Sequence, residues 1–255
     1  MRLTETRRFA EALGSWMHFE ACCFRAGLFS ESSFKSAIGS VASSLHARHK
    51  AARVHADYPL SSIQKVPDAE RKAGGGRKRS VDFAIIYDDG REPPSDPELL
   101  IEAKWAGSSH CTIANITADL IRLCIMKKAH PDATCMFVLA GHARDVDKVL
   151  SRRPFLGGRK DAIRTDGSGT IRKFKFLPKN SEHQHAFASA ISSFHAVNLR
   201  VPIAFCTSGS APYPSAPAKF KAAAWEVHSV DPQNLAVGDW KKPRKRSELA
   251  ENAIL

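Results

Sequence analysis

The chain has 255 residues, of which 43% are hydrophobic and 25% are charged. This balance excludes a disordered chain and favours one large globular domain, or one domain with an elaboration. Lys and Arg number 38 against 26 Asp and Glu, so the formal net charge is +12 at pH 7. A basic excess of this size favours an anionic partner, such as nucleic acid or, less often, an anionic membrane surface.

The six cysteines lack any C-x-x-C pair or regular spacing, which argues against a disulfide framework or a zinc knuckle. We expect them to be reduced thiols, mostly buried. Residues 1–20 carry charges throughout and have no uninterrupted apolar core, so they match neither a signal peptide nor a membrane span. We therefore expect a cytoplasmic location and no membrane partner.

The N-terminal part is typical of two helices followed by a strand. Residues 5–27 place apolar side chains three and four positions apart, which is the spacing of one face of an amphipathic helix. These side chains belong to Phe9, Leu13, Trp16, Phe19 and Cys23. A second helix is predicted over 31–49 with Ser30 as its N-cap, and residues 52–58 are compatible with a strand.

The next segments predict a strand followed by a βαβ unit. Residues 80–87 are rich in strand-forming side chains, and a loop leads from them to an apolar strand over 98–105. A helix over 112–129 follows, with Thr112 as its N-cap, and then comes the almost wholly apolar stretch 134–140. A strand, a crossover helix and a second buried strand imply a parallel pair within one sheet.

The pattern is weaker beyond residue 150. Strand-like stretches and one helical stretch occur over 170–178, 182–198, 200–208 and 222–230. We expect these segments to extend the same sheet. The sequence thus divides into a core over 1–150, an extension over 151–238 and a basic tail over 239–255, which we expect to be disordered.

Strand alternation brings charged side chains to one face. In the segment 98–105, Glu102 and Lys104 project to the same face, and Asp82 comes beside Glu102 if the two strands pair as a hairpin. Two adjacent carboxylates repel each other, and Mg²⁺ typically binds one or two carboxylates together with waters and substrate phosphate. A lysine beside such a metal can orient or deprotonate the attacking water, or stabilise charge on the phosphorane.

Asp82 in "SVDFAII", with Glu102 and Lys104 in "LIEAKWA", resembles the motif of the PD-(D/E)XK nuclease superfamily. The element order is also similar, because that family's core runs helix, three strands, helix, strand, with the first acid on the second strand and E-x-K on the third. The resemblance implies an α/β fold with a restriction-endonuclease-like core (αβββαβ). Its mixed sheet is flanked by helices, and a C-terminal elaboration of strands and a helix follows.

The resemblance also implies a function. Asp82 and Glu102 are expected to bind Mg²⁺, with Mn²⁺ as a substitute, while Lys104 assists hydrolysis of a DNA phosphodiester. The family's first helix often supplies a further carboxylate, and we assign this role to Glu20. An RNA substrate stays open, and a homodimer is considered because duplex cleavage by a single active site often calls for two copies. The main alternative is an inactive nucleic-acid-binding subunit with the same fold.

Each charged residue also has an ordinary structural explanation. Glu102 and Lys104 alone fit an ion pair on an exposed strand, which would contribute little stability. Asp82 alone fits a strand start, and Glu20 fits a solvated helix position. For Asp119 and Asn115 on the following helix, a contact with substrate or water and a solvated polar face explain the residues equally well, so both stay outside the predicted catalytic set.

A Gly-rich basic loop precedes the strand that carries Asp82. Five of the nine residues from 71 to 79 are basic, namely Arg71, Lys72, Arg77, Lys78 and Arg79. Because the loop enters that strand, its charges are predicted to bind nucleic-acid phosphates near the site of cleavage. A solvated linker is the alternative, and "AGGGRKRS" lacks the spacing of a phosphate-cradling P-loop.

Overall fold

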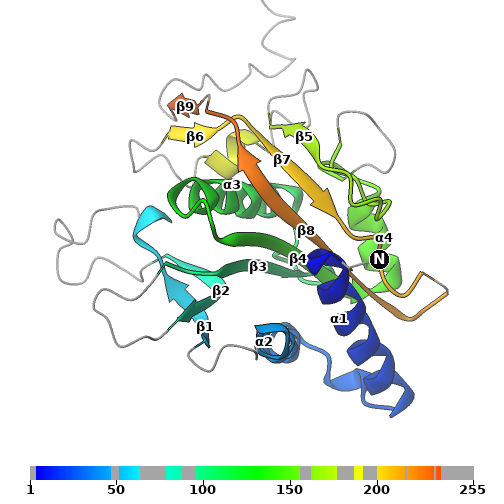
Figure 1. Ribbon diagram of the computed structural model, residues 1–255. Coiled ribbons are helices and arrows are strands. Elements are labelled where there is room, and N and C mark those ends of the chain that lie inside the picture. The colour runs from blue at the N-terminus through cyan, green and yellow to red at the C-terminus, as the bar shows by residue number, and fades with distance from the viewer. Residues whose placement is uncertain are drawn as a thin grey trace, which may run out of the picture.

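The computed structural model describes residues 4–46, 52–63, 79–87, 96–155, 162–176, 187–191, 200–215, 217–232 and 234–236. A seven-stranded mixed sheet lies at its centre, with helices on both faces (Figure 1). The helices are α1 (Glu5–Cys22), α2 (Glu31–His46), α3 (Ile113–Ala129) and α4 (Ala143–Leu150), with 3₁₀ turns η1 (Ala26–Leu28) and η2 (Ser61–Ile63). The strands are β1 (Ala52–Pro59), β2 (Ser80–Tyr87), β3 (Leu99–Trp105), β4 (Thr134–His142), β5 (Arg172–Lys175), β6 (Arg200–Pro202), β7 (Ala204–Gly209), β8 (Phe220–Val230) and β9 (Asn234–Ala236). The predicted mixed α/β class is therefore confirmed.

The strand order in the large sheet is β1-β2-β3-β4-β8-β7-β5. Strands β1, β2 and β3 form an antiparallel meander, whereas β3 and β4 run parallel and are connected through α3, which confirms the predicted βαβ unit. Strands β8, β7 and β5 continue the sheet by antiparallel pairing. Strand β6 instead pairs with β9 in a separate two-stranded sheet. The prediction that residues 200–208 extend one sheet is thus right for β7 and wrong for β6.

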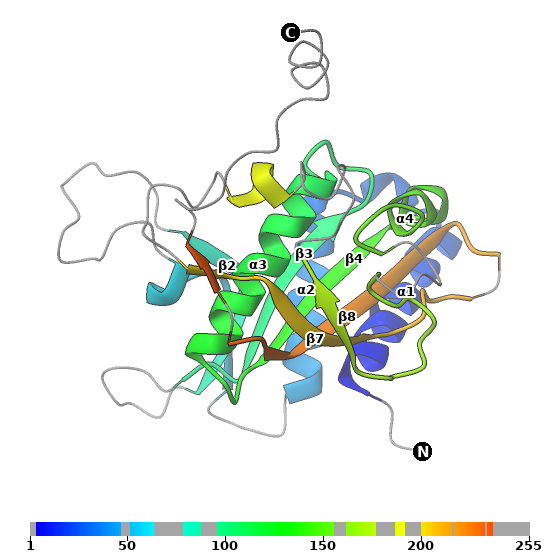
Figure 2. The same cartoon turned by 90° about the horizontal axis from the view of Figure 1, so that it is seen from above.

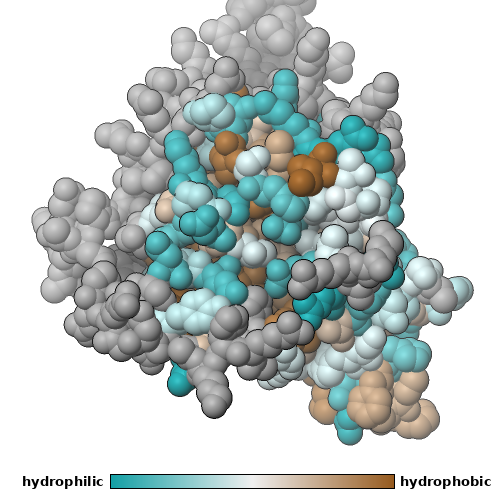
Figure 3. Space-filling view, in the orientation of Figure 1, coloured by the Kyte–Doolittle hydropathy of each residue, from teal (hydrophilic) through white to brown (hydrophobic). Residues whose placement is uncertain are grey.

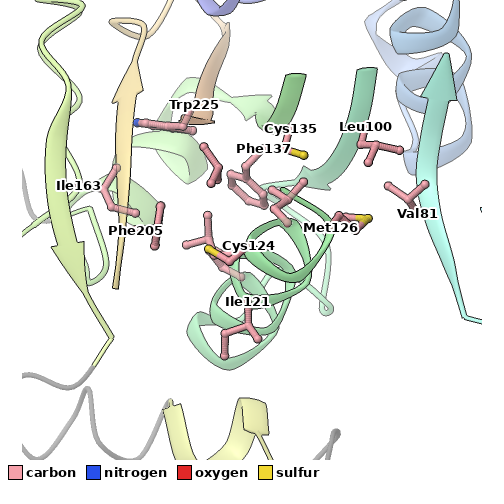
Figure 4. Packing of buried hydrophobic residues seen from close by; sticks show 14 of the residues in the cluster. Val81, Leu100, Ile121, Cys124, Met126, Cys135, Phe137, Ile163, Phe205 and Trp225 are labelled. Carbon is pink, nitrogen blue, oxygen red and sulfur yellow. The ribbon is translucent and has the colours of Figure 1, made fainter. Parts of the chain in front are cut away.

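Two hydrophobic clusters cover the two faces of the sheet. On one face, Cys124 of α3 lies near Phe137 of β4, and Met126 lies on the side of Leu100 of β3 and Val81 of β2 (Figure 4). Helices α1 and α2 cover the opposite face, as Figures 1 and 2 show, and contribute Phe9 and other apolar side chains to the second cluster. Strand β4 is buried from both sides, as its apolar sequence predicts.

Capping residues define where the helices of the core begin. The side chain of Thr112 accepts a hydrogen bond from the Asn115 backbone N–H at 3.2 Å, as predicted for the N-cap of α3. Ser30 is the N-cap of α2 in the same way, because its Oγ accepts a hydrogen bond from the Ser33 backbone N–H at 3.2 Å. Helix α4 follows β4 directly and was not predicted. It buries only Val146 and Leu150, too few apolar positions to establish a helical period.

Helix α1 buries a different stripe from the predicted one. Phe9 and Leu13 are buried as expected, but Met17 completes the buried face. Phe19 is 58% exposed and Cys23 is also exposed, so the buried face of the helix does not follow the predicted apolar stripe to its end. Figure 3 shows apolar atoms at the surface over this end of α1.

All six cysteines are free thiols, as predicted from their spacing. The expectation that most of them are buried is wrong. Two are buried (Cys124 and Cys135), two are partly buried (Cys111 and Cys206) and two are exposed (Cys22 and Cys23).

The core assignment gives a matched test of stability. Phe137 is fully buried between the sheet and α3, whereas Phe24 is 98% exposed. We expect Phe137→Ala to lower the free energy of unfolding by about 4 kcal/mol, because it removes apolar burial and leaves a cavity. Phe24→Ala is expected to change it by about 0.5 kcal/mol or less. Urea unfolding followed by circular dichroism measures both, and equal effects would contradict the packing described above.

Candidate active site

The hairpin of β2 and β3 brings the predicted acids to neighbouring positions. Its ladder pairs Ile85 with Leu99 and ends at Phe83 opposite Ile101. Continuing that register by one residue sets Asp82 opposite Glu102. The predicted antiparallel hairpin is therefore present, with both acids just beyond the last ladder pair.

Asp82 lies where the backbone ladder between the two strands stops. Its Oδ2 accepts the Ala103 backbone N–H at 2.9 Å, so the side chain replaces a strand-to-strand hydrogen bond. Its Oδ1 accepts from Lys35 Nζ of α2, also at 2.9 Å. Burial acts to raise the pKa of Asp82, but these two hydrogen bonds and the nearby charge of Lys104 outweigh burial and lower it. Asp82 is thus an ionised carboxylate at neutral pH, held from two sides.

Glu102 is a buried carboxylate held by an arginine. Its side chain is only 1% exposed, and both of its oxygens accept hydrogen bonds from Arg122 of α3, one from Nε and one from Nη2, each at 2.9 Å. This two-bond geometry is the strongest form of a carboxylate–guanidinium pair. It overturns the alternative of an exposed ion pair between Glu102 and Lys104, because Glu102 is buried and its partner is Arg122.

A third carboxylate completes the cluster. Asp119 of α3 is 3% exposed and accepts from Arg122 Nη2 at 2.5 Å, while its Oδ2 lies 2.7 Å from Lys104 Nζ. Asp119 therefore connects Lys104 to Arg122. The interpretation of Asp119 as part of a solvated polar face is wrong, because the side chain is buried within the site.

Burial and mutual repulsion raise the pKa values of the two deepest acids. Burial raises the pKa of Glu102 to about 8, against the lowering by Arg122, and the charges of Asp119 and Asp82 add to the rise. Burial also raises the pKa of Asp119, against the cations beside it. Burial and repulsion between the acids thus outweigh the cations at Glu102 and Asp119, so a proton competes for Glu102 at neutral pH.

Lys104 keeps its proton firmly. Burial acts to lower its pKa, but the carboxylates of Asp119, Glu102 and Asp82 outweigh burial and raise it above the ordinary value. The side chain is therefore an ammonium ion at neutral pH, pointing into the acidic cluster.

Helix α2 supplies a further carboxylate, that of Glu31, at the same edge of the site. Glu31, its first residue, raises the pKa values of Lys35 and Cys111 and so lies within electrostatic range of both. Glu31 Oε2 also accepts a long hydrogen bond, 3.4 Å, from Ser108 Oγ in the loop after β3. A helix carboxylate is thus present beside the cluster, supplied by α2.

Glu20, the carboxylate predicted for this role, is engaged elsewhere. It lies near the end of α1, where Arg25 donates to both of its oxygens at 2.5 and 2.9 Å. Among the described residues, no hydrogen bond or ion pair joins Glu20 to Asp82, Glu102 or Lys104.

The predicted basic loop is described only at its last residue. Arg79 precedes β2, and burial together with the charge of Arg122 lowers its pKa, which places it within electrostatic range of the cluster. The other four predicted phosphate-binding residues, Arg71, Lys72, Arg77 and Lys78, lie outside the described residues.

Sequence reasoning missed three residues of the site, namely Lys35, Asp119 and Arg122. Each lies on a helix, where a polar side chain normally indicates a position that faces solvent. The one available signal is the pair Asp119 and Arg122, which are three apart and therefore share a helix face next to Leu120 and Leu123. This charged pair lies beside the apolar stripe of the helix that follows the E-x-K strand. Its position indicates that the two charged side chains face the sheet.

The Arg122 contacts predict a large effect of mutation on stability. We expect Arg122→Met to lower the free energy of unfolding by about 3 kcal/mol, because two buried carboxylates lose their shared cation. Adding Glu102→Gln is expected to restore part of that loss. The control is Arg144→Met on α4, an exposed arginine without an ion pair among the described residues. Equal effects of the two arginine substitutions in a urea titration would contradict the buried cluster.

Within the described ranges, no three His, Cys, Asp or Glu side chains are grouped so that they can hold a metal ion. No helix in the same ranges is long and apolar enough to cross a membrane. Comparisons of the chain with protein-family models, with curated proteins and with solved structures found no match.

Proposed function

We propose that this chain is a metal-dependent nuclease that hydrolyses phosphodiester bonds of DNA. One observation carries the proposal. Asp82 and the pair Glu102 and Lys104 lie on adjacent antiparallel strands, at the point where the ladder between those strands ends. Strongly basic composition supports a polyanionic substrate.

The order of elements supports a restriction-endonuclease-like core. Helix α2, strands β1, β2 and β3, helix α3 and strand β4 follow one another in the order αβββαβ. The first acid lies on the second of these strands and E-x-K on the third, as in the PD-(D/E)XK superfamily that the sequence resembles. Helix α2, rather than α1, directly precedes β1. We therefore propose Glu31 in place of Glu20 as the carboxylate that the first core helix supplies.

The donor set suits Mg²⁺. Asp82 and Glu102 offer hard oxygen ligands, and Mg²⁺ commonly binds one or two carboxylates while keeping waters and substrate phosphate. Each carboxylate oxygen has two lone pairs, so the hydrogen bonds from Arg122 and Lys35 leave acceptor capacity on Glu102 and Asp82. A bound metal would lower the pKa of its water and polarise the phosphoryl oxygen.

The protonated state of Lys104 selects among its predicted roles. A lysine whose pKa is raised is a poor general base, because it holds its proton at neutral pH. It is well suited to donate a hydrogen bond to an oxygen on which negative charge develops. We therefore assign charge stabilisation and orientation of water to Lys104, and Asp119 positions its ammonium group.

A second candidate function is an inactive nucleic-acid-binding subunit. Its support is the charge balance of the cluster. The acids Asp82, Glu102 and Asp119 contact three cations, Lys35, Lys104 and Arg122, so each acid has a cationic partner without any metal. A cluster paired in this way can serve a purely structural role.

Cleavage assays separate the two functions. The purified chain is incubated with linear, supercoiled and single-stranded DNA in Mg²⁺, Mn²⁺ or EDTA. We expect cleavage with metal and a loss of roughly a hundredfold or more in Asp82→Asn and Lys104→Met, because each removes a group that stabilises the transition state. Glu20→Gln is the matched control and is expected to cleave like the unmodified chain.

Several outcomes would contradict the nuclease. Cleavage that persists in EDTA or in both site variants excludes the proposed chemistry. DNA binding without cleavage in any metal favours the second candidate. An RNA substrate run in parallel tests whether hydrolysis is restricted to DNA.

Metal binding can be measured without cleavage. If Asp82 and Glu102 hold the ion, millimolar Mn²⁺ is expected to raise the Tm of the chain, since a ligand that binds only the folded state stabilises it. Asp82→Asn is expected to abolish the shift and Glu20→Gln to preserve it. An equal shift in both variants would place the ion elsewhere.

A further inference from the structure

A cavity of about 620 Å³ lies beside the candidate active site. Its walls come from the loop that follows β3, the beginning of α3 and helix α4, and the short helical stretch 187–191 contributes Ser189. In Figure 2, α4 lies near the end of α3 at which that helix begins.

The cavity lies close to the acidic cluster. Ala106 and Gly107 line it and directly follow the E-x-K strand, so the lining begins two residues after Lys104. Ile116 lines it from α3, and Asp119 is three residues further along the same helix. Burial raises the pKa of Cys111, a lining residue, to about 11, while the charge of Lys104 acts to lower it. A molecule in the cavity therefore reaches the neighbourhood of Lys104.

Two unpaired cations line the cavity. Lys148 and Arg152 are exposed, and within the described part of the chain neither side chain makes a hydrogen bond or an ion pair. Lys148 lies in the last turn of α4, and Arg152 lies two residues beyond the end of that helix. The other charged lining residue is Asp145, whose carboxylate can accept a hydrogen bond from an amino or hydroxyl group. Two cations and one carboxylate give this rim an excess of positive charge, which favours an anionic ligand.

The remaining lining combines aliphatic side chains with hydroxyl groups and one thiol. Ile113, Ala114, Ile116 and Val149 form apolar walls, and the volume falls within the range of cavities that hold small ligands. An anionic group joined to a flat heterocyclic ring matches this combination, because the ring faces pack on the apolar walls and the polar ring edges can bond to hydroxyl groups. A nucleotide has this composition, with its phosphate for the cations and its base for the apolar walls.

We propose that this cavity binds one nucleotide of the DNA strand, adjacent to the phosphate that is cleaved. Lys148 and Arg152 hold the backbone phosphate, and the aliphatic walls receive the unstacked base. The inference rests on the proposed function, because it assigns the cavity to the substrate of that site. It predicts that a strand with an accessible base binds better than an intact duplex.

Protection of Cys111 tests occupancy directly. The full chain is treated with a thiol reagent in EDTA, and modification of each cysteine is measured by mass spectrometry. A ten-residue oligothymidylate at saturation is expected to slow modification of Cys111 at least fivefold, because the ligand covers the thiol. Exposed Cys22 on α1 is the internal control and is expected to react at an unchanged rate. Thymidine 5′-monophosphate and inorganic phosphate are run in parallel.

Charge variants test the same cavity by affinity. Lys148→Ala and Arg152→Ala are each expected to weaken oligothymidylate binding about tenfold, because each removes a charge-assisted hydrogen bond to phosphate. Arg144→Ala is the matched control, since Arg144 is exposed on the same helix but does not line the cavity. Fluorescence anisotropy in EDTA measures all three without cleavage.

The outcomes separate this inference from the proposed function. Cleavage of DNA without protection of Cys111, or equal weakening by Arg144→Ala, overturns the cavity assignment alone. Protection by the mononucleotide but not by the oligonucleotide overturns the assignment to a strand. Protection by the oligonucleotide in a chain that cleaves nothing supports the cavity and contradicts the nuclease.

Discussion

The hydrogen bonds between Arg122 and Glu102 hold the candidate site together. Glu102 lies on a central strand of the sheet, where a carboxylate without a partner would be strongly destabilising. Arg122 satisfies both oxygens of Glu102 and also reaches Asp119, which in turn binds Lys104. The position of α3 against β3 and the direction of the Lys104 ammonium group therefore depend on one guanidinium.

Buried charge of this kind is difficult to explain by stability alone. A well-packed apolar residue is often as stable as a buried ion pair, or more stable. This chain nevertheless places three carboxylates and three cations together at the end of the β2 and β3 ladder. The cost is reasonable if the acids and Lys104 act on a substrate.

Much of the fold was predictable because apolar periodicity is local. The segments of β2, β3, α3 and β4 each carry their pattern within a few residues, and the E-x-K strand could be placed from alternation alone. The partners of the site were not predictable in this way, because Lys35 and Arg122 look solvated in their own helices. Their contacts with Asp82 and Glu102 join residues 47 and 20 positions apart, which only the folded sheet brings together. The role given to Glu20 did not follow from this pattern, because the sequence already placed a second helix, over 31–49, between Glu20 and the first strand, and in the structure Arg25 donates to both oxygens of Glu20.

We propose that Asp82 and Glu102 together hold a divalent metal. Anomalous X-ray diffraction from crystals soaked in Mn²⁺ tests it most directly, because the peak locates the ion without reference to activity. The account predicts one peak at coordination distance from a carboxylate oxygen of each residue, with the Lys104 ammonium group nearby. A peak elsewhere, or none between these two residues at saturating Mn²⁺, would contradict it.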